Sequence, residues 1–288
     1  MSPVRFSESE IQKRFADLSG IRYLKAGGQK TVYAAVHAVH GDVVLKLINS
    51  APGDERIQRE IEIVRTNTFP HVPRILDSGT CDIQSANQLY LIEQRIEGED
   101  LRAILVRDGK LPFPQVVKCL GSLLETIEAL EAAHIVHRDI KPDNILLDRK
   151  GDYWLLDFGI ARDLGKVSLT DTEATMGPHS IGYAPPEQLF NQKAIEDSRT
   201  DLFSLGVTAY ELFSGIHPFR KDAHSFVEVV TRVTSLKETP LSILEDTKGT
   251  ISAFVQTLMQ KAQPFRPPSA AIALDWFNNI LQDYNIGL

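Results

Sequence analysis

The order of apolar and polar positions divides the chain into a strand-rich first third and a helical remainder. Apolar runs at residues 32–36 and 43–48 are separated by the turn residues His40-Gly41-Asp42, which predicts a β-hairpin. Residues 56–66 then return to helical spacing. Further short strands are expected at residues 74–76 and 89–92.

Beyond Gly98 apolar residues recur at helical spacing. Residues 116–134 carry an apolar stripe, and residues 202–214 are apolar nearly all round, which is typical of a buried central helix. Further helices are expected at residues 225–233, 251–261 and 270–281. Strands followed by helices predict an α+β protein with two lobes, a β-rich one at residues 21–97 and a larger helical one at residues 98–288.

The first residues carry their own helical pattern. Ser7 and Glu10 have the spacing of a capping box, which predicts a helix that starts there. Leu18 would lie on its apolar face and Gly20 would end it. Residues 1–20 are therefore expected to form a helical extension.

Composition narrows the class of protein. Hydrophobic residues at 43% and charged residues at 24% of 288 are ordinary for a globular protein with a core. A net charge of −7 argues against nucleic acid as a partner. Two isolated cysteines, Cys81 and Cys119, suggest a reducing compartment. Neither a secretion signal nor a run of about 18 apolar residues is visible, so we expect a cytoplasmic protein without a membrane partner.

The most informative segment is 137–144, which reads His-Arg-Asp-Ile-Lys-Pro-Asp-Asn. One short loop would offer a proton acceptor at Asp139, an ammonium at Lys141 and a metal-binding amide at Asn144. A second carboxylate, Asp157, follows after a predicted hairpin. Phosphoryl transfer needs groups that orient a hydroxyl and groups that hold magnesium against polyphosphate.

This pattern resembles the catalytic loop and the metal-binding triplet of Ser/Thr protein kinases. The family's lysine strand, the end of its activation segment and the start of its central helix follow the same order over about residues 20 to 285. The compact form and the Pro-Pro-Glu-Gln string at residues 185–188 look most like bacterial eukaryotic-like kinases. The resemblance implies the two-lobed kinase fold, and transfer of the ATP γ-phosphate to Ser or Thr of a protein substrate.

The same resemblance implies a role for each residue of the loop. Asp139 would accept or orient the substrate hydroxyl proton, and Lys141 would neutralise the γ-phosphate as charge develops. Asn144 and Asp157 would hold Mg²⁺, or Mn²⁺, against the phosphates of ATP.

Lys46 matches the lysine that contacts the α- and β-phosphates in the family. It follows three apolar residues in its strand and needs a partner. Glu60 and Glu62 both lie on the following helix, but on different faces. Only Glu60 has the family's spacing, so it is the expected partner.

The nucleotide-binding residues are also implied by the resemblance. Val32 and Val44 would form the roof over adenine and Leu146 the floor. The hinge would lie within residues 92–97, and the same alignment places the charged Glu93 where the family normally has an apolar residue.

The phosphate-covering loop departs from the family. Lys25, Gly27 and Lys30 hold the positions of the three usual glycines, and Gly28 adds some flexibility. The two lysines could attract phosphate by charge, so Gly27, Gly28 and Lys30 stay candidates for ATP contacts. The altered loop also keeps a second hypothesis open, a pseudokinase that binds nucleotide or a partner without catalysis. A small-molecule phosphotransferase of kinase-like fold is disfavoured, because it would not carry Lys141-Pro142 or an extended activation segment.

The resemblance also implies a regulatory phosphorylation site and two structural contacts inside the protein. In the family, Arg138 and Arg162 bind a phosphate on the activation segment. We expect that phosphate on Thr172 or Thr175, with Thr170 next. The structural anchors are Glu187 paired with Arg266, and Asp201 bound to the catalytic-loop backbone.

Overall fold

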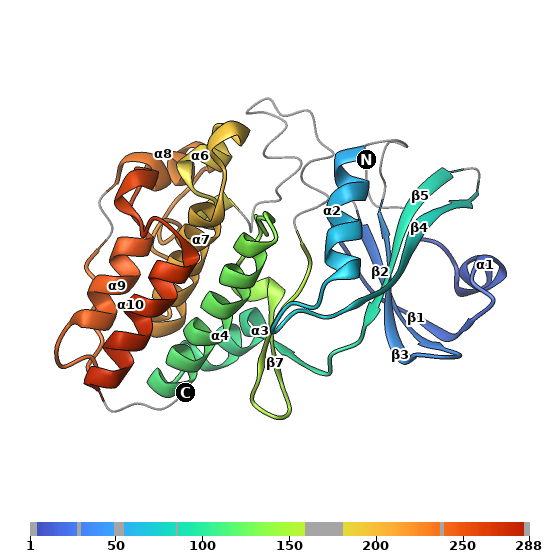
Figure 1. Ribbon diagram of the computed structural model, residues 1–288, viewed down its shortest axis with the longest axis horizontal. Helices are drawn as coiled ribbons and strands as arrows, with labels where there is room; N and C mark the ends of the chain where they lie inside the picture. Colours follow the sequence, from blue (N-terminus) through green and yellow to red (C-terminus); the bar gives the residue numbers. More distant parts are fainter. Residues whose placement is uncertain are drawn as a thin grey trace. The chain divides into compact units, whose positions relative to one another are not determined.

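The computed structural model describes residues 5–27, 30–48, 55–84, 86–158, 181–236 and 239–284 (Figure 1). These residues fall into two compact units. The first runs to Phe69 and includes Pro73–Glu97, and the second contains Pro70–Val72, Gly98–Phe158 and the residues from 181 onward. Within the described ranges, no helix has the length and apolar character that crossing a bilayer requires.

The first unit is built on an antiparallel five-stranded sheet with the order β1-β2-β3-β5-β4. The strands are β1 (Leu18–Gly27), β2 (Lys30–His37), β3 (Gly41–Ile48), β4 (Ile75–Ile83) and β5 (Ala86–Gln94). Figure 1 shows the sheet between two helices, α1 (Glu8–Arg14) and α2 (Glu55–Thr66). The predicted hairpin is confirmed, since β2 and β3 pair along their whole length.

The two faces of this sheet bury different sets of side chains. Successive residues of a strand point to opposite faces. Leu45 and Leu47 of β3 pack in a core cluster with Tyr33 and with Ile11 of α1. Val44 and Lys46 alternate with them and therefore lie on the other face. The sheet thus separates a purely apolar core from the face that carries Lys46.

The helix at the start of the chain is shorter than predicted. The capping box of Ser7 and Glu10 is present, but α1 ends at Arg14. Leu18 begins β1, where it pairs with His37 and is buried. Gly20 lies within that strand at φ +57°, beside a shift in register. The prediction that Leu18 and Gly20 belong to the helix was wrong, because pairing with β2 determines this part of the chain.

The second unit is mainly helical. Its helices are α3 (Leu101–Asp108), α4 (Phe113–Ala132), α6 (Pro186–Leu189), α7 (Ser198–Ser214), α8 (Phe226–Ser235), α9 (Thr250–Leu258) and α10 (Ala270–Asp283). A small sheet, β6 (Gly98–Asp100), β7 (Ile145–Asp148) and β8 (Tyr153–Leu155), has the order β6-β7-β8.

Helix α7 is the centre of this unit, as predicted. It packs against α4, α9 and α10, and nearly all of its residues are buried. The Asp197 side chain caps its first turn by accepting from the amide of Arg199. Gly215 ends it in the left-handed region at φ +72°, where glycine is least strained. A strand-rich unit followed by a helical unit confirms the α+β class.

Candidate active site

Three of the predicted catalytic residues meet at one carboxylate. The loop residues 137–141 lead into a short 3-10 turn, Pro142–Asn144. Lys141 Nζ lies 3.0 Å from Asp139 Oδ2. Asn144 Nδ2 donates to the same oxygen at 2.8 Å and to the Asp139 carbonyl at 2.9 Å. The Asp139 side chain is therefore held in one orientation from two sides.

Asp157 is brought to this loop by the hairpin of β7 and β8. Ile145 pairs with Leu155, and the amide of Leu156 donates to the Asn144 carbonyl at 2.7 Å. Asp157 is 8% exposed and has φ +63°. A left-handed conformation costs a residue with a side chain on the order of 1 kcal/mol and clusters at functional sites. The strained position supports a functional role for this carboxylate.

Asn144 and Asp157 suit a hard divalent cation. Both amide N–H groups of Asn144 are directed at Asp139, which leaves its oxygen as the ligand atom. Amide and carboxylate oxygens are what Mg²⁺ and Mn²⁺ prefer. In the described part of the chain, no three His, Cys, Asp or Glu residues are grouped so that they could hold a metal. Two oxygen ligands, from Asn144 and Asp157, suit a divalent cation that takes its other ligands from substrate phosphates and water.

Asp201 holds the backbone that carries the catalytic aspartate. The carboxylate of this fully buried residue on α7 accepts from the amide of His137 at 2.7 Å and from that of Arg138 at 2.8 Å. Burial raises the pKa of Asp201 to about 6, although the two backbone hydrogen bonds oppose that rise. The predicted anchor is thus present. The ring centroids of His137 and Phe158 lie 4.9 Å apart, so the histidine packs against the phenylalanine.

Arg138 has a carboxylate partner that the sequence analysis missed. Its Nε donates to Glu196 Oε2 at 3.0 Å, and both side chains are nearly buried. Gln188 also donates to the Arg138 carbonyl at 2.8 Å. The other predicted phosphate ligand, Arg162, and the predicted acceptors Thr170, Thr172 and Thr175 lie outside the described residues. In the sequence, nothing indicates that Glu196 pairs with Arg138, because it is only a charged residue shortly before a buried helix.

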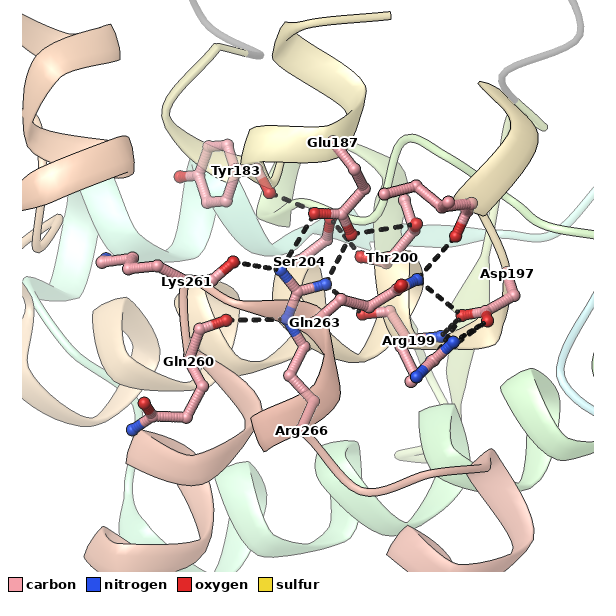
Figure 2. Close-up of polar contacts among 11 residues, drawn as sticks. Tyr183, Glu187, Asp197, Arg199, Thr200, Ser204, Gln260, Lys261, Gln263 and Arg266 are labelled. Atoms are coloured by element: carbon pink, nitrogen blue, oxygen red, sulfur yellow. Dashed lines mark hydrogen bonds and ion pairs between the residues drawn. The ribbon is translucent and has the colours of Figure 1, made fainter. Parts of the chain in front are cut away.

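The predicted contact between Glu187 and Arg266 forms a buried, bidentate ion pair (Figure 2). The two guanidinium nitrogens lie 2.5 and 3.0 Å from the carboxylate oxygens. Arg266 also donates to the carbonyls of Arg199, Gln260 and Lys261. Because the charges are matched and their hydrogen bonds made, this pair joins α6 and the start of α7 to the chain after α9.

A second polar network was not predicted. Arg102 of α3 donates to Glu211 of α7 at 2.8 Å and to Asp143 of the catalytic loop at 3.2 Å. The hydroxyl of Tyr183 bonds with both Arg102 and Glu211. Burial raises the pKa of Tyr183 well above its ordinary value, so it stays protonated. Glu211, the single carboxylate in the largely apolar run of residues 202–214, was the available signal.

In the first unit, the predicted nucleotide-binding residues share one face of the sheet. Val32 of β2 pairs directly with Lys46 of β3, and Val44 is two residues from Lys46. All three therefore point to the same side. Leu146, the predicted floor, lies half-buried on β7 of the second unit.

The hairpin of β1 and β2 carries the predicted phosphate loop. Lys25 pairs with Val32, and Gly27 pairs with Lys30 beside the turn. Gly28 lies outside the described residues. The nucleotide contacts expected for Gly27, Gly28 and Lys30 stay predictions.

Lys46 forms a buried ion pair with Glu93 of β5. Glu60, the predicted partner, lies half-buried on α2, and its pairing with Lys46 stays a prediction. The signal for Glu93 was present in the sequence, because two opposite charges in two apolar strands must be compensated once those strands are neighbours.

Comparison with known proteins agrees with this geometry. Residues 21–277 match a family model described as the protein kinase domain. The chain is 30% identical over 269 residues to a probable serine/threonine-protein kinase of Clostridium perfringens, covering 90% of this chain and 38% of that protein. It is 34% identical over 206 residues to the serine/threonine-protein kinase PknL of Mycobacterium tuberculosis, covering 69% of this chain and 50% of PknL. PknH of Mycobacterium bovis is 32% identical over 222 residues, which cover 75% of this chain and 36% of PknH.

Proposed function

Because the chain belongs to the protein kinase family, we propose that it transfers the γ-phosphate of ATP to Ser or Thr hydroxyls of protein substrates. The observation that carries the proposal is the convergence of Lys141 and Asn144 on one oxygen of Asp139. The names of the bacterial relatives support the Ser/Thr class. The chain spans 38% to 50% of the length of these two relatives, so the substrates are part of the proposal.

In this mechanism Asp139 orients the substrate hydroxyl and accepts its proton. Lys141 lies beside Asp139, where its ammonium can approach the transferred phosphoryl group and offset its charge. Asp201 keeps the loop backbone in place through its two hydrogen bonds, so the carboxylate need not reorganise as the reaction proceeds.

Nucleotide binding in this proposal uses apolar side chains for adenine and charged or polar side chains for the phosphates and their metal ion. Val32, Val44 and Leu146 contact adenine in this proposal, and Lys46 contacts the phosphates. Asn144 and Asp157 hold Mg²⁺ or Mn²⁺, which when bound neutralises negative charge on the ATP phosphates. Phosphoryl transfer is therefore achieved by positioning and electrostatics rather than by a covalent enzyme intermediate.

Replacement of Asp139 by Asn tests the proposal. The variant keeps the size of the side chain but loses the proton acceptor. We expect phosphate incorporation into casein to fall by at least about 100-fold, the lower range for general base catalysis. The affinity for Mg-ATP, measured by calorimetric titration, should change little because Asp139 acts on the hydroxyl.

The matched control is Asp152→Asn, which changes a half-buried carboxylate paired with Lys118 after β7. It should keep full activity. Undiminished transfer by the Asp139→Asn protein would contradict the assignment. Phosphate found on tyrosine alone would contradict the Ser/Thr class, and nucleotide binding without transfer by the parent protein would favour a pseudokinase.

A further inference from the structure

We propose that Glu93 is a positioning residue for Lys46, which it holds from the neighbouring strand of the sheet. This inference rests on the proposed function, in which Lys46 contacts the phosphates of ATP. It adds a second carboxylate to the one expected on helix α2 and does not depend on whether Glu60 also reaches the lysine.

The register of the sheet places the two residues on one face. β3 and β5 are antiparallel, with Leu91 opposite Lys46 and Glu93 opposite Val44. Lys46 and Glu93 are therefore diagonal neighbours on the same face. Such positions are about 7–8 Å apart, within reach of long side chains. The ion pair between Lys46 Nζ and Glu93 Oε2 spans that gap.

The cross-strand neighbours of Lys46 are apolar. Lys46 is 6% exposed and Glu93 is 8% exposed, while Val32 and Leu91, which flank Lys46 on the same face, are buried. An ammonium in such a place must be compensated by an opposite charge. Because Glu93 is on a strand that is hydrogen-bonded along its length to β3 and β4, the position of its carboxylate is set by the sheet backbone.

Stability alone does not account for a carboxylate at this position. A buried ion pair is often no more stabilising than apolar residues of similar volume. An apolar side chain at residue 93 would extend the apolar face formed by Val32 and Leu91. What the carboxylate adds is a defined direction for the Lys46 ammonium, through a charge-assisted contact.

A double-mutant cycle on Mg-ATP binding tests this role. Calorimetric titration gives the dissociation constant for the parent protein, Glu93→Gln, Lys46→Met and the double variant. We expect Glu93→Gln to weaken binding about fivefold, which corresponds to an interaction energy of about 1 kcal/mol. In the Lys46→Met background the same change should alter binding by less than about twofold, because there is no ammonium left to position.

Glu62→Gln is the matched control. Glu62 is an exposed carboxylate on α2 that pairs with Arg65, and its removal should leave the affinity for Mg-ATP unchanged. Thermal unfolding of each variant establishes that it is folded. If Glu93→Gln does not fold, Glu93→Met is used in its place. If Lys46→Met does not fold, Lys46→Gln is used.

Three results would overturn the inference. If Glu93→Gln binds Mg-ATP as tightly as the parent protein or more tightly, the Lys46 ammonium does not depend on a carboxylate of β5 for its position. Losses that add in the double variant would show that Glu93 acts on the sheet or on the nucleotide independently of Lys46. A parent protein that does not bind Mg-ATP would instead overturn the proposed function on which the inference depends.

Discussion

At the scale of single residues, Asp201 has the most unusual environment of the groups that support the catalytic loop. Its side chain is fully buried and accepts two backbone hydrogen bonds, yet burial still raises its pKa to about 6. The folded protein therefore binds a proton at this site more tightly than the unfolded chain does. Between the ordinary pKa of 3.8 and about 6, this group lowers the free energy of unfolding as the pH rises.

This shift predicts a pH-dependent difference between the parent protein and Asp201→Asn, which cannot titrate at this position. The variant should be less stable at every pH, because its amide N–H₂ faces one of two backbone donors. The stability advantage of the parent should grow by about 1 kcal/mol when the pH is lowered from 7 to 5. Urea unfolding at both pH values measures it. An advantage that shrinks toward pH 5 would contradict the raised pKa.

Contacts within the catalytic loop could be predicted from spacing, and the distant pair of Glu187 and Arg266 from the family resemblance, but the pair across the sheet was not predicted. The spacing from Asp139 to Asn144 was sufficient to expect both residues in one short loop, where the structure shows them in contact. The Lys46 strand was recognised, but its partner was sought on the following helix. Glu93 was found only when the register of β3 and β5 was known. Nonlocal strand pairing is not encoded in the spacing of either residue.

At the scale of elements, α7 and α9 pack closely against each other at Gly206. Gly206 is fully inside this contact. A Cβ atom there would lie 2.8 Å from Leu258 Cβ and 2.9 Å from Met259 Cγ. Cβ atoms of real proteins essentially never approach that closely, so the absence of a side chain allows α7 and α9 to come together.

Gly206→Ala is therefore expected to destabilise the protein although alanine is the better helix former. The gain in helix propensity is up to about 1 kcal/mol, whereas overpacking a core costs about 1–3 kcal/mol. Since the Cβ of Leu258 cannot move without the backbone of α9, the overpacking should dominate, with a net loss of about 1 kcal/mol.

The control for this variant is Asn278→Ala, an exposed position on α10 where alanine meets no neighbour in a core. It should be neutral or slightly stabilising. Urea unfolding measures both variants. A Gly206→Ala protein at least as stable as the parent would show that α7 and α9 can separate at little cost.

Helices were predicted correctly where the local pattern of apolar residues agrees with the packing in the structure. The buried central helix was identified from its continuous apolar run. Its start was placed one turn too late because Ser198, Thr200 and Asp201 are polar but buried. Helix α1 was predicted too long, since nothing local shows that Leu18 pairs with β2. Helix α3 was not predicted. It has only eight residues, and its Arg102 is held by carboxylates of other elements.

At the scale of the whole molecule, the predicted control by phosphorylation would act through Arg138. The sequence predicts a phosphate on Thr172 or Thr175 as its partner. The second unit already supplies a carboxylate, Glu196, at 3.0 Å from the arginine. Both side chains are nearly buried, so a phosphate on the activation segment would compete with Glu196 or replace it.

This competition predicts that the cost of Glu196→Gln depends on phosphorylation. Removing one partner of a buried ion pair costs about 3–5 kcal/mol. A phosphate carries about −1.5 to −2 charge and can take the place of the carboxylate, so the cost should be smaller in the phosphorylated protein. The unphosphorylated form is obtained in the Asp139→Asn background, in which self-phosphorylation is absent.

Thermal unfolding of four proteins measures the effect: the active protein and the Asp139→Asn protein, each with and without Glu196→Gln. A loss of 1 kcal/mol lowers the midpoint by about 2–4 °C in a chain of this size. We expect a drop of several degrees in the inactive background and a clearly smaller one in the active protein.

Mass spectrometry should find phosphate on Thr172 or Thr175 only in the active form. Glu99→Gln, which removes an exposed partner of Arg107, should have a small effect that is the same in both backgrounds. Equal drops for Glu196→Gln, or an active protein without phosphate on this segment, would show that Glu196 is the permanent partner of Arg138 and that activity does not depend on a phosphate there.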